Sequence, residues 1–454
     1  MIRNIQLQRY RSVDELTLPL GPITLLIGQN AGGKSNIMDA LRLLAEGVRP
    51  DMETAVARRG GLDSVVFLGA PPGARNFEIA IDYSVPDVEF PKPRSVMSYR
   101  VRVAARVVAN GLPQAESGGE TDGSGFGGGQ ASGAGYADGT GDGSGDAPGA
   151  GYGDGSGDDY NTRIGVELED LRANGGHSEW GQDGIWLQVH RGKGSALRNP
   201  ETGQREDLNT GDPGVLTLKA LGFLDAYPRI RTLRSFIEGW QFLTVDVARI
   251  REPQRDRPER VLASDASNLA ALLRTLSAAQ RERYEMILLD SLELLRHVES
   301  ISTRVDSDRV LLLMREKGLP RPLEALSLSD GTLRLLAIVA ALETMPEYGL
   351  LCIEEPEHGL HPLILGPLLD LVRERCPATG ARQVLLTTHT PDLVDTPDLV
   401  DAAEPDEIVP VERDEHGATH IRALDTAELN EWLQDLTAPV TIPYKKRSIV
   451  SPAA

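Results

Sequence analysis

Cysteine, long apolar runs and positive charge are all scarce in this 454-residue chain. Its two cysteines, Cys352 and Cys376, are too few for a disulfide framework and suit a reducing compartment, so we expect a cytoplasmic protein. The longest apolar stretch, residues 335–342, is far shorter than the ~18 residues of a membrane-spanning helix. The first twelve residues also lack the apolar core of a signal peptide. Neither membrane insertion nor export is predicted.

The net charge of −20 argues against a chain that coats nucleic acid by bulk charge, although it leaves room for a local basic groove. Residues 115–159 hold 18 of the 47 glycines and nine acidic residues, with no lysine or arginine. Removing these nine acids from the net charge of −20 leaves −11 for the rest of the chain. The segment repeats GDGSGD but lacks a nonapeptide period, so a flexible acidic insertion is favoured over a calcium-binding repeat.

Hydrophobic periodicity divides the chain into four parts. Alternating apolar and polar residues predict strands at 77–83, 98–108 and 185–190, on both sides of the insertion. Residues 215–295 are mainly of helical pattern. We therefore expect an N-terminal lobe over 1–75, a β-rich region over 76–214 that carries the insertion, a helical region over 215–320 and a C-terminal lobe over 321–454.

A phosphate-binding loop is the most specific motif. The apolar run ITLLI at 23–27 predicts a buried strand, and it leads directly into GQNAGGKS at 28–35, followed by an amphipathic helix. Glycines allow the backbone N–H groups to approach phosphate oxygens, while the helix N-terminus favours negative charge. Lys34 is then expected at the β- and γ-phosphates, and Ser35 at Mg²⁺. A glycine turn with an incidental lysine is disfavoured, because strand, loop and helix follow in the required order.

Two carboxylates end a second apolar run, in LLCIEEPEHGLHP at 350–362. The carboxyl ends of parallel strands face the same crevice as the phosphate loop, which places Glu354 at Mg²⁺ or its water and Glu355 at the attacking water. A solvated acidic strand end is the alternative. His358 and His361 suggest zinc, but no second ligand set accompanies them in the sequence, so a turn is favoured.

Two further motifs surround this pair. Ser329 or Asp330 is expected to cap the apolar helix that follows, and with Gly331 the same N-terminus is also a candidate anion site. The run QVLLTTHT predicts another buried strand that ends at His389. A lone histidine is more often structural, but at a strand tip in this order of motifs we favour a sensor of the γ-phosphate.

Together these segments resemble the ABC-type ATPase head in its AAA-family form, similar to the OLD (overcoming lysogenization defect), SMC and RecF heads. The resemblance rests on residues 4–44, 262–276, 328–342, 353–362 and 385–395. It implies an α/β P-loop NTPase head with an antiparallel β layer and an interposed helical region. The nucleotide-contacting positions that it implies are Arg11, Gly28, Asn30, Gly32, Gly33, Lys34, Ser35, Asn36, Ser329 and Gly331. It further implies Ser35 and Glu354 as Mg²⁺ ligands, and Glu355, Lys34 and His389 as catalytic residues.

The resemblance also implies a homodimer that sandwiches two ATP molecules, because Ser329 and Gly331 match residues that contact the partner's ATP in such heads. An ATPase that controls a separate effector or DNA, in phage defence or DNA maintenance, is the expected function. No Toprim nuclease domain is expected after His389. A nucleotide-binding subunit of a transporter and a nucleotide-gated scaffold for a toxin or nuclease are the alternatives.

Two observations qualify the resemblance. No Q-loop glutamine is found after the phosphate-loop helix, where RRGGLDSVVFLGAP stands at 58–71, and Walker B carries Glu354 where aspartate is frequent. For DNA, the candidates are basic residues in two clusters: Arg249, Arg251, Arg255, Arg257 and Arg260, and then Lys445, Lys446 and Arg447. Interleaved acids favour a solvated face for the first cluster.

Overall fold

The structure is a computed structural model, and the described residues are 1–71, 75–84, 96–108, 161–173, 184–199, 202–211, 214–378, 382–389, 399–422, 424, 427–429 and 432. The chain divides into two compact units, one formed by residues 1–105 with 164–454 and the other by residues 106–163. The first unit carries all the motifs above and is described here. The predicted insertion at 115–159 and the basic residues Lys445, Lys446 and Arg447 lie outside the described residues.

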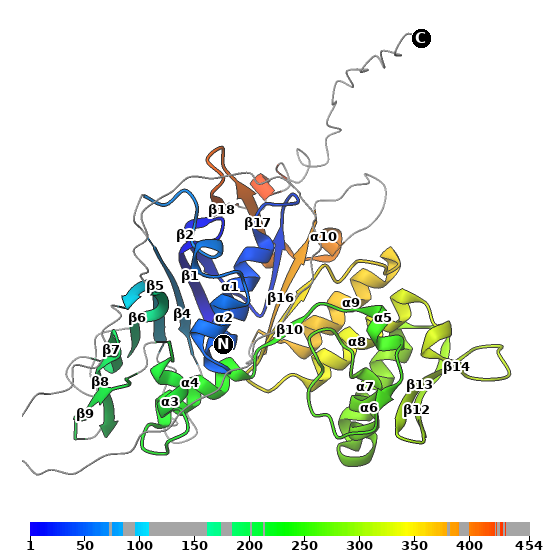
Figure 1. Cartoon of the computed structure of the whole chain (residues 1–454). Helices are drawn as coiled ribbons and strands as arrows, with labels where there is room; N and C mark the ends of the chain where they lie inside the picture. The colour runs from blue at the N-terminus through cyan, green and yellow to red at the C-terminus, as the bar shows by residue number, and fades with distance from the viewer. Residues whose placement is uncertain are drawn as a thin grey trace, which may run out of the picture. The chain divides into compact units, whose positions relative to one another are not determined.

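A mainly parallel sheet forms the centre of the first unit (Figure 1). Its strand order is β10 (Gln241–Leu243), β15 (Leu350–Glu354), β16 (Gln383–Thr388), β3 (Ile23–Ile27), β17 (Ile408–Arg413) and β18 (Thr419–Ile421). The first five strands are parallel, and β18 returns antiparallel to β17. Because every residue of β3 and β16 is buried, these apolar runs fit strands that are covered on both faces.

Alternate residues of the central strands enter two different hydrophobic cores. Ile23, Leu25 and Ile27 pack into one core, whereas Leu26 packs into the other. The same alternation continues in β15 and β16. This follows from the period of two in a strand, in which successive side chains point to opposite faces.

The first core lies between the central sheet and an antiparallel sheet. The order of that sheet is β2 (Val13–Pro19), β1 (Ile2–Tyr10), β4 (Asn76–Tyr83), β5 (Met97–Val108), β6 (Asn161–Ala173), β7 (Ile185–His190), β8 (Lys193–Asn199) and β9 (Gln204–Asn209). Helices α1 (Lys34–Val48), α2 (Met52–Ala57), α3 (Thr217–Leu221) and α4 (Pro228–Glu238) contribute their apolar faces to this core. The strands predicted at 77–83, 98–108 and 185–190 are confirmed.

The second core lies on the other face of the central sheet. It contains apolar side chains from α5 (Val247–Arg251), α6 (Leu269–Ala279), α7 (Arg281–Leu294), α8 (Asp330–Thr344), α9 (Pro362–Arg375) and α10 (Leu399–Ala402). Helix α8 is buried along most of its length, as its continuous apolar sequence requires. The predicted α/β head, with an antiparallel layer and an interposed helical region, is confirmed.

The region 215–320 contains strands that the sequence analysis did not predict. Besides β10, these are β11 (Gln254–Arg255), β12 (Val298–Asp306) and β13 (Arg309–Glu316), with β14 (Leu323–Glu324) following. Seven of the nine residues of β12 are not buried, so its apolar alternation is too weak to identify it as a strand. Among the described residues, no helix is long and apolar enough to cross a membrane.

Candidate active site

The loop between β3 and α1 has the geometry of a phosphate cradle. Ala31 and Gly33 have positive φ angles of 65° and 105°, so the backbone turns sharply before the first turn of α1. Lys34 is buried, and its Nζ donates hydrogen bonds to the carbonyl oxygens of Gly28 at 2.6 Å and Gln29 at 3.0 Å. Asn30 and Ser35 are exposed. The predicted lysine therefore lies against the loop, and Ser35 is open to a ligand.

The β17–β18 hairpin encloses this loop and explains two of its glycines. A Cβ atom on Gly28 would lie 2.0 Å from the carbonyl oxygen of Val411. One on Gly33 would lie 2.0 Å from the Oγ1 atom of Thr419. Real Cβ contacts are never this short, so the hairpin can pack here only because both positions lack side chains.

A buried bridge of hydroxyl groups holds the loop, and the sequence analysis did not foresee it. Thr419 Oγ1 donates to the carbonyl oxygen of Gly32 at 3.0 Å and lies 2.7 Å from Ser12 Oγ. Asn36 Nδ2 donates to Ser12 Oγ at 2.6 Å. Asn36, predicted as a nucleotide contact, thus supports the loop through Ser12. Ser12 and Thr419 are 407 positions apart in the chain, which is why sequence proximity gave no signal.

Arg11 lies beside helix α1, where its guanidinium forms an ion pair with Asp39 at 2.9 Å. Asp39 also accepts hydrogen bonds from Tyr10 Oη at 2.6 Å and Arg59 Nε at 3.0 Å. Burial alone would raise the pKa of Asp39, but the hydrogen bonds from Arg59 and Tyr10 outweigh it and lower that pKa. Asp39 is about one helical turn beyond Ser35, so Arg11 is held on the flank of the helix that begins at the phosphate loop.

Glu354 ends β15 at the same edge of the sheet as the phosphate loop, because β15, β16 and β3 are parallel neighbours. Its Oε1 atom lies 3.3 Å from Arg42 Nη2, which also reaches Thr244 Oγ1 at 3.4 Å. The Arg42 guanidinium stacks over Phe242, 5.3 Å from the ring centroid. A serine hydroxyl and a carboxylate are the oxygen ligands that Mg²⁺ prefers, so Ser35 and Glu354 fit the predicted metal by their chemistry.

Strand β10 brings a further loop to the Walker B strand. It pairs with β15, so the loop that begins at Thr244 is the one that reaches the tip of the Walker B strand. The segment 58–71, where the sequence analysis looked for a glutamine, runs beside the end of β1 instead, with Tyr10 bridged to Val66. A long β region separates α1 from β10 in the chain.

Glu355 has a strained backbone and two histidine neighbours. Its φ angle is +48°, a left-handed value that is uncommon for a residue with a side chain, and its N–H donates to Thr387 O at 3.0 Å. His389 Nε2 contacts Glu355 Oε1, and His358 Nδ1 lies 2.9 Å from Glu355 Oε2. The structure therefore brings Glu355 and His389 together as the strand order predicted, and adds His358 from the following turn.

A third carboxylate, Glu357, is half-buried and bound to Thr388, the residue before His389. Thr388 Oγ1 donates to Glu357 Oε1 at 2.6 Å, and burial raises the pKa of Glu357. Burial lowers the pKa of Lys34, while the charges of Glu355 and Glu357 act in the opposite direction. The Lys34 ammonium thus lies within electrostatic reach of both carboxylates, although Lys34 and Glu355 are far apart in sequence.

The segment before α8 is fixed by contacts within the chain. Ser329 Oγ accepts a hydrogen bond from Thr332 N at 3.1 Å, which confirms the predicted cap. A Cβ atom on Gly331 would lie 2.5 Å from the carbonyl oxygen of Gly359, so this glycine allows α8 to pack against the turn after Walker B. Arg251 Nη2 donates to the carbonyl oxygen of Leu328 at 2.7 Å and to Asp330 at 2.6 Å.

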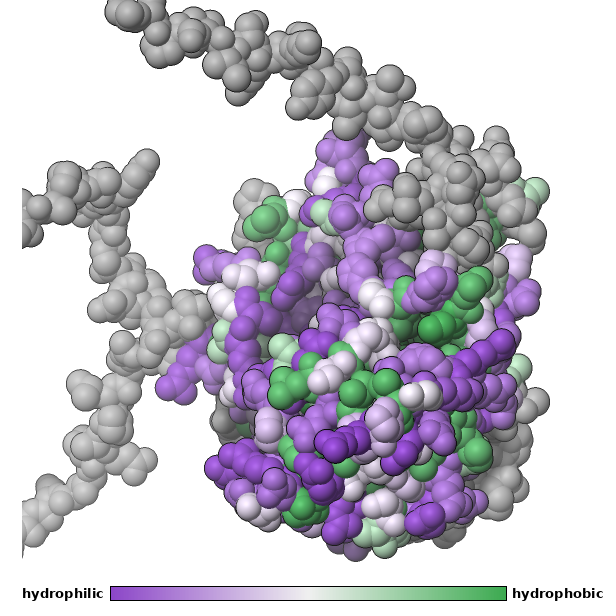
Figure 2. Space-filling view, turned by 90° about the vertical axis from the view of Figure 1, so that its right-hand side faces the viewer, coloured by the Kyte–Doolittle hydropathy of each residue, from purple (hydrophilic) through white to green (hydrophobic). Residues whose placement is uncertain are grey.

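The arginines proposed for DNA are mostly paired. Arg251 binds the segment before α8, Arg257 lies 2.5 Å from Glu259, and Arg249 lies 3.6 Å from Asp265. This pairing supports the solvated-face interpretation for these three side chains. The face shown in Figure 2 has hydrophobic groups separated by hydrophilic ones, with no single continuous apolar surface in view.

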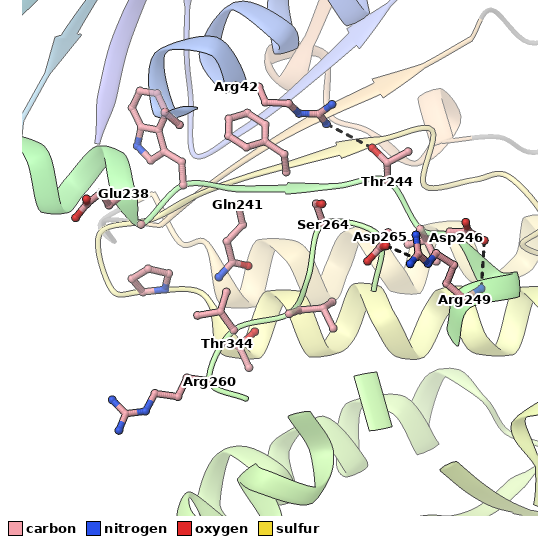
Figure 3. Close-up of a pocket in the computed structure, with 18 of the residues that line it drawn as sticks. Arg42, Glu238, Gln241, Thr244, Asp246, Arg249, Arg260, Ser264, Asp265 and Thr344 are labelled. Carbon is pink, nitrogen blue, oxygen red and sulfur yellow. Dashed lines mark hydrogen bonds and ion pairs between the residues drawn. The ribbon is translucent and has the colours of Figure 1, made fainter. Parts of the chain in front are cut away.

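A cavity of about 1340 Å³ opens beside β10 (Figure 3). Its lining includes Arg42 and Thr244, which approach each other at one side of the view, and Arg260 at the other. Among the described residues, the lining arginines Arg260, Arg283 and Arg334 have no acidic partner. The lining contains both arginines and carboxylates, and Arg42 links the cavity to Glu354 at the tip of the Walker B strand.

The fold and this site define a class: the chain is a P-loop ATPase of the ABC type. It belongs to the family described as "AAA domain, putative AbiEii toxin, Type IV TA system", which matches residues 101–395, and residues 1–78 match the family described as "AAA ATPase domain". The predicted assignment of this chain to the ABC-type, AAA-family ATPases is confirmed.

Individual relatives are distant. The chain is 33% identical to the OLD nuclease of Thermus scotoductus over 54 residues. These residues are 12% of this chain and 10% of that protein. The chain therefore spans only about a tenth of this curated relative. An SMC head bound to the C-terminal winged-helix domain of ScpA has a TM-score of 0.50 at 15% identity, covering 94% of this chain and 99% of that one. An SMC head with an extended coiled coil, bound to the C-terminal domain of ScpA derived from Pyrococcus furiosus, has a TM-score of 0.48 at 13% identity, covering 96% and 99%. The first likeness shows the fold.

Proposed function

We propose that this protein binds and hydrolyses ATP and dimerises on ATP to control a separate effector or DNA, in phage defence or DNA maintenance in the cytoplasm. One observation carries the hydrolysis: Lys34, Glu354, Glu355 and His389 gather at one edge of the parallel sheet, although they come from three separate parts of the chain. Phosphoryl transfer needs positioning and charge stabilisation at such an edge more than covalent chemistry.

Each side chain has a role that its surroundings support. Lys34 carries the positive charge that receives the phosphates, within reach of the opposing charges of Glu355 and Glu357. Mg²⁺ bound with ATP, at Ser35 and Glu354, would neutralise phosphate charge. Glu355 orients and deprotonates the attacking water, and its two carboxylate oxygens contact His358 and His389. His389 contacts that carboxylate and fixes its orientation as the phosphate sensor.

The proposed dimer uses the segment before α8. Ser329 and Gly331 stand at the N-terminus of a 15-residue helix, where free N–H groups favour an anion. Gly331 packs against Gly359, four residues after Glu355, so ATP held by a second copy would be coupled to the turn that carries the catalytic carboxylate. We assign the partner's ATP to this helix end because Ser329 and Gly331 match the signature positions of related heads.

Control of an effector needs a surface that senses the nucleotide. The cavity beside β10 supports this role, because Arg42 lies in its lining and also contacts Glu354. A change in the coordination of Glu354 would move Arg42 and thereby the cavity wall. An effector with an acidic segment suits the unpartnered arginines Arg260, Arg283 and Arg334.

The test is the variant Glu355→Gln. It should bind ATP without turnover and elute at twice the chain mass of 49.1 kDa in light-scattering chromatography with ATP and Mg²⁺. The matched control is Glu347→Gln, because Glu347 is exposed and precedes the amino end of β15, opposite the tip that carries Glu355. Hydrolysis by Glu355→Gln at the wild-type rate would refute the assignment of the base, and a monomer in ATP would refute the dimer.

A salt-dependent gel shift with and without ATP tests the DNA alternative. Binding that weakens steeply with salt and requires ATP supports a DNA-linked role. If the protein does not shift the DNA either with or without ATP, the proposal is restricted to a protein effector. Capture experiments with Glu355→Gln would then identify that effector, because the ATP-bound state persists in this variant.

A further inference from the structure

Glu355, His358 and His389 form a compact group at the tips of β15 and β16. One ligand atom from each side chain, a carboxylate oxygen and two imidazole nitrogens, lies within 4.8 Å of the others. Glu355 Oε2 is 2.9 Å from His358 Nδ1, and the second carboxylate oxygen contacts His389 Nε2. Three potential metal ligands therefore converge from two strand ends and the turn between them, a combination that sequence spacing did not reveal.

The spacing and the chemistry suit a transition metal. Zinc bound at about 2.0–2.2 Å by two nitrogens and an oxygen requires ligand atoms roughly 3.3 Å apart in tetrahedral geometry. Movements of about 1.5 Å or less would bring ligand atoms that lie within 4.8 Å of one another to this spacing, and the side chains have room to move, since His358 is 58% and His389 31% exposed. Two histidines with a glutamate leave a fourth position open, as in zinc sites that keep a water ligand. Mg²⁺, which prefers six oxygen ligands, does not suit this set.

We propose that Glu355, His358 and His389 bind Zn²⁺, or a similar imidazole-seeking divalent metal, and that this metal inhibits the ATPase. Metal binding itself depends only on the three side chains. The inhibition rests on the proposed function, because it requires Glu355 to be the base and His389 the sensor. A metal on the Glu355 carboxylate competes with the attacking water for the same oxygen atoms and holds His389 away from the phosphate.

The backbone around the group supports a preformed site. Glu355 keeps a left-handed φ of +48° and donates its N–H to Thr387 O at 3.0 Å, so its backbone is held against the end of β16. The His358 and His389 rings lie 5.8 Å apart between centroids, on either side of that carboxylate. A site whose ligands already face one another loses little entropy on binding. Exposure of His358 gives the ion a path from solvent.

The experiment measures Zn²⁺ binding to the full chain without nucleotide, by calorimetry, and records the absorption spectrum of Co²⁺ bound in place of zinc. We expect one site with tetrahedral Co²⁺ bands, and at least about a tenfold loss of affinity in His358→Ala, because one of three protein ligands is removed. The control is His361→Ala, since His361 belongs to the same motif but caps α9 through Leu363 N at 3.3 Å. It should bind zinc as the wild type does.

A second control addresses another histidine and carboxylate pair, His420 and Asp414, which lie 2.9 Å apart on the β17–β18 hairpin. If His420→Ala loses zinc and His358→Ala does not, the proposed site is wrong. Equal affinity in the wild type and His358→Ala also overturns it. The two proposals can fail separately. If the chain binds zinc through His358 but does not hydrolyse ATP, the zinc site stands and the proposed ATPase function is wrong.

Inhibition is then measured by ATP turnover at saturating Mg²⁺ with increasing Zn²⁺. The wild type and His361→Ala should lose activity over the same range of zinc concentration as the calorimetric titration. His358→Ala should require at least about tenfold more zinc for the same fractional loss, in proportion to its weaker binding. Zinc that binds through His358 and leaves turnover unchanged would refute the inhibitory role.

Discussion

Substituting alanine for Gly33 tests how the distant hairpin shapes the phosphate loop. The new Cβ atom would lie 2.0 Å from Thr419 Oγ1, 2.7 Å from its Cγ2 and 2.9 Å from its Cβ. Thr419 cannot turn away freely, because it is fully buried and its hydroxyl is held by Gly32 O and Ser12 Oγ. Gly33 also has a φ of +105°, which alanine adopts only under strain.

The magnitude has two parts. A strained backbone angle costs about 1–3 kcal/mol, and contacts between neighbouring side chains couple by about 0.5–3 kcal/mol. If the loop relaxes by leaving its phosphate-binding shape, ATP must restore that shape on binding. The dissociation constant for ATP then rises about tenfold for each 1.4 kcal/mol of this cost. We therefore expect Gly33→Ala to weaken ATP binding by at least about tenfold, while thermal stability changes less.

The assay is a double-mutant cycle with Thr419→Gly, read by fluorescence titration with a labelled ATP analogue and by thermal unfolding. Thr419→Gly removes all three atoms that overlap the new Cβ, but leaves the backbone strain at position 33. The double variant should therefore bind the analogue more tightly than the sum of the two single effects predicts. Strict additivity would refute the steric argument. Wild-type affinity in Gly33→Ala alone would refute both parts.

Two further predictions concern charged groups. Arg42→Gln should lower the Mg²⁺ concentration needed for half-maximal ATP binding by up to about fivefold, because partly exposed ion pairs contribute about 0.2–1 kcal/mol and the change frees Glu354. Burial raises the pKa of Asp290 to about 6, above the ordinary value near 3.9. The folded state therefore holds this proton more tightly, and the resulting stability is lost as the pH rises through about 6. As the pH is lowered from 7.5 to 5, the melting temperature of the wild type should thus increase relative to that of Asp290→Asn.

Each of these has a matched control. Arg49 is the C-cap residue of the same helix and binds the carbonyl oxygens of Glu238 and Trp240, so Arg49→Gln should leave the Mg²⁺ dependence unchanged. An equal change in both variants would mean that Arg42 acts only through general charge. For Asp290, which pairs with Arg375 at 2.6 Å, a relative melting temperature that is constant with pH would show that its carboxyl does not take up a proton on folding.

The parts of the site that the sequence predicted are those in which neighbouring residues determine the geometry. Strand β3, the loop and α1 are contiguous, so the order of apolar run, glycines and amphipathic helix was enough to identify them. Glu355 and His389 were each predicted at the end of a buried strand, and such ends share one edge of a parallel sheet, where the two side chains are in contact.

The missed features depend on contacts that the chain order does not show. Thr419 supports the loop from a hairpin almost at the other end of the described chain, and its sequence context is an ordinary polar turn. His358 reaches Glu355 because the backbone is left-handed at Glu355, which no residue type there predicts. Strand β12 was missed because its exposed face and its weakly apolar inner face give little alternation.

The strand order of the central sheet affects how the protein is made. Strand β3 lies between β16 and β17, so its neighbours on both sides are synthesised long after it leaves the ribosome. Until residues 383–388 and 408–419 emerge, an all-apolar strand and the loop that follows it have no partner strand in their own sheet. Translation therefore delays completion of this sheet, and the close packing of Val411 and Thr419 against the phosphate loop forms only after the C-terminal hairpin has been made.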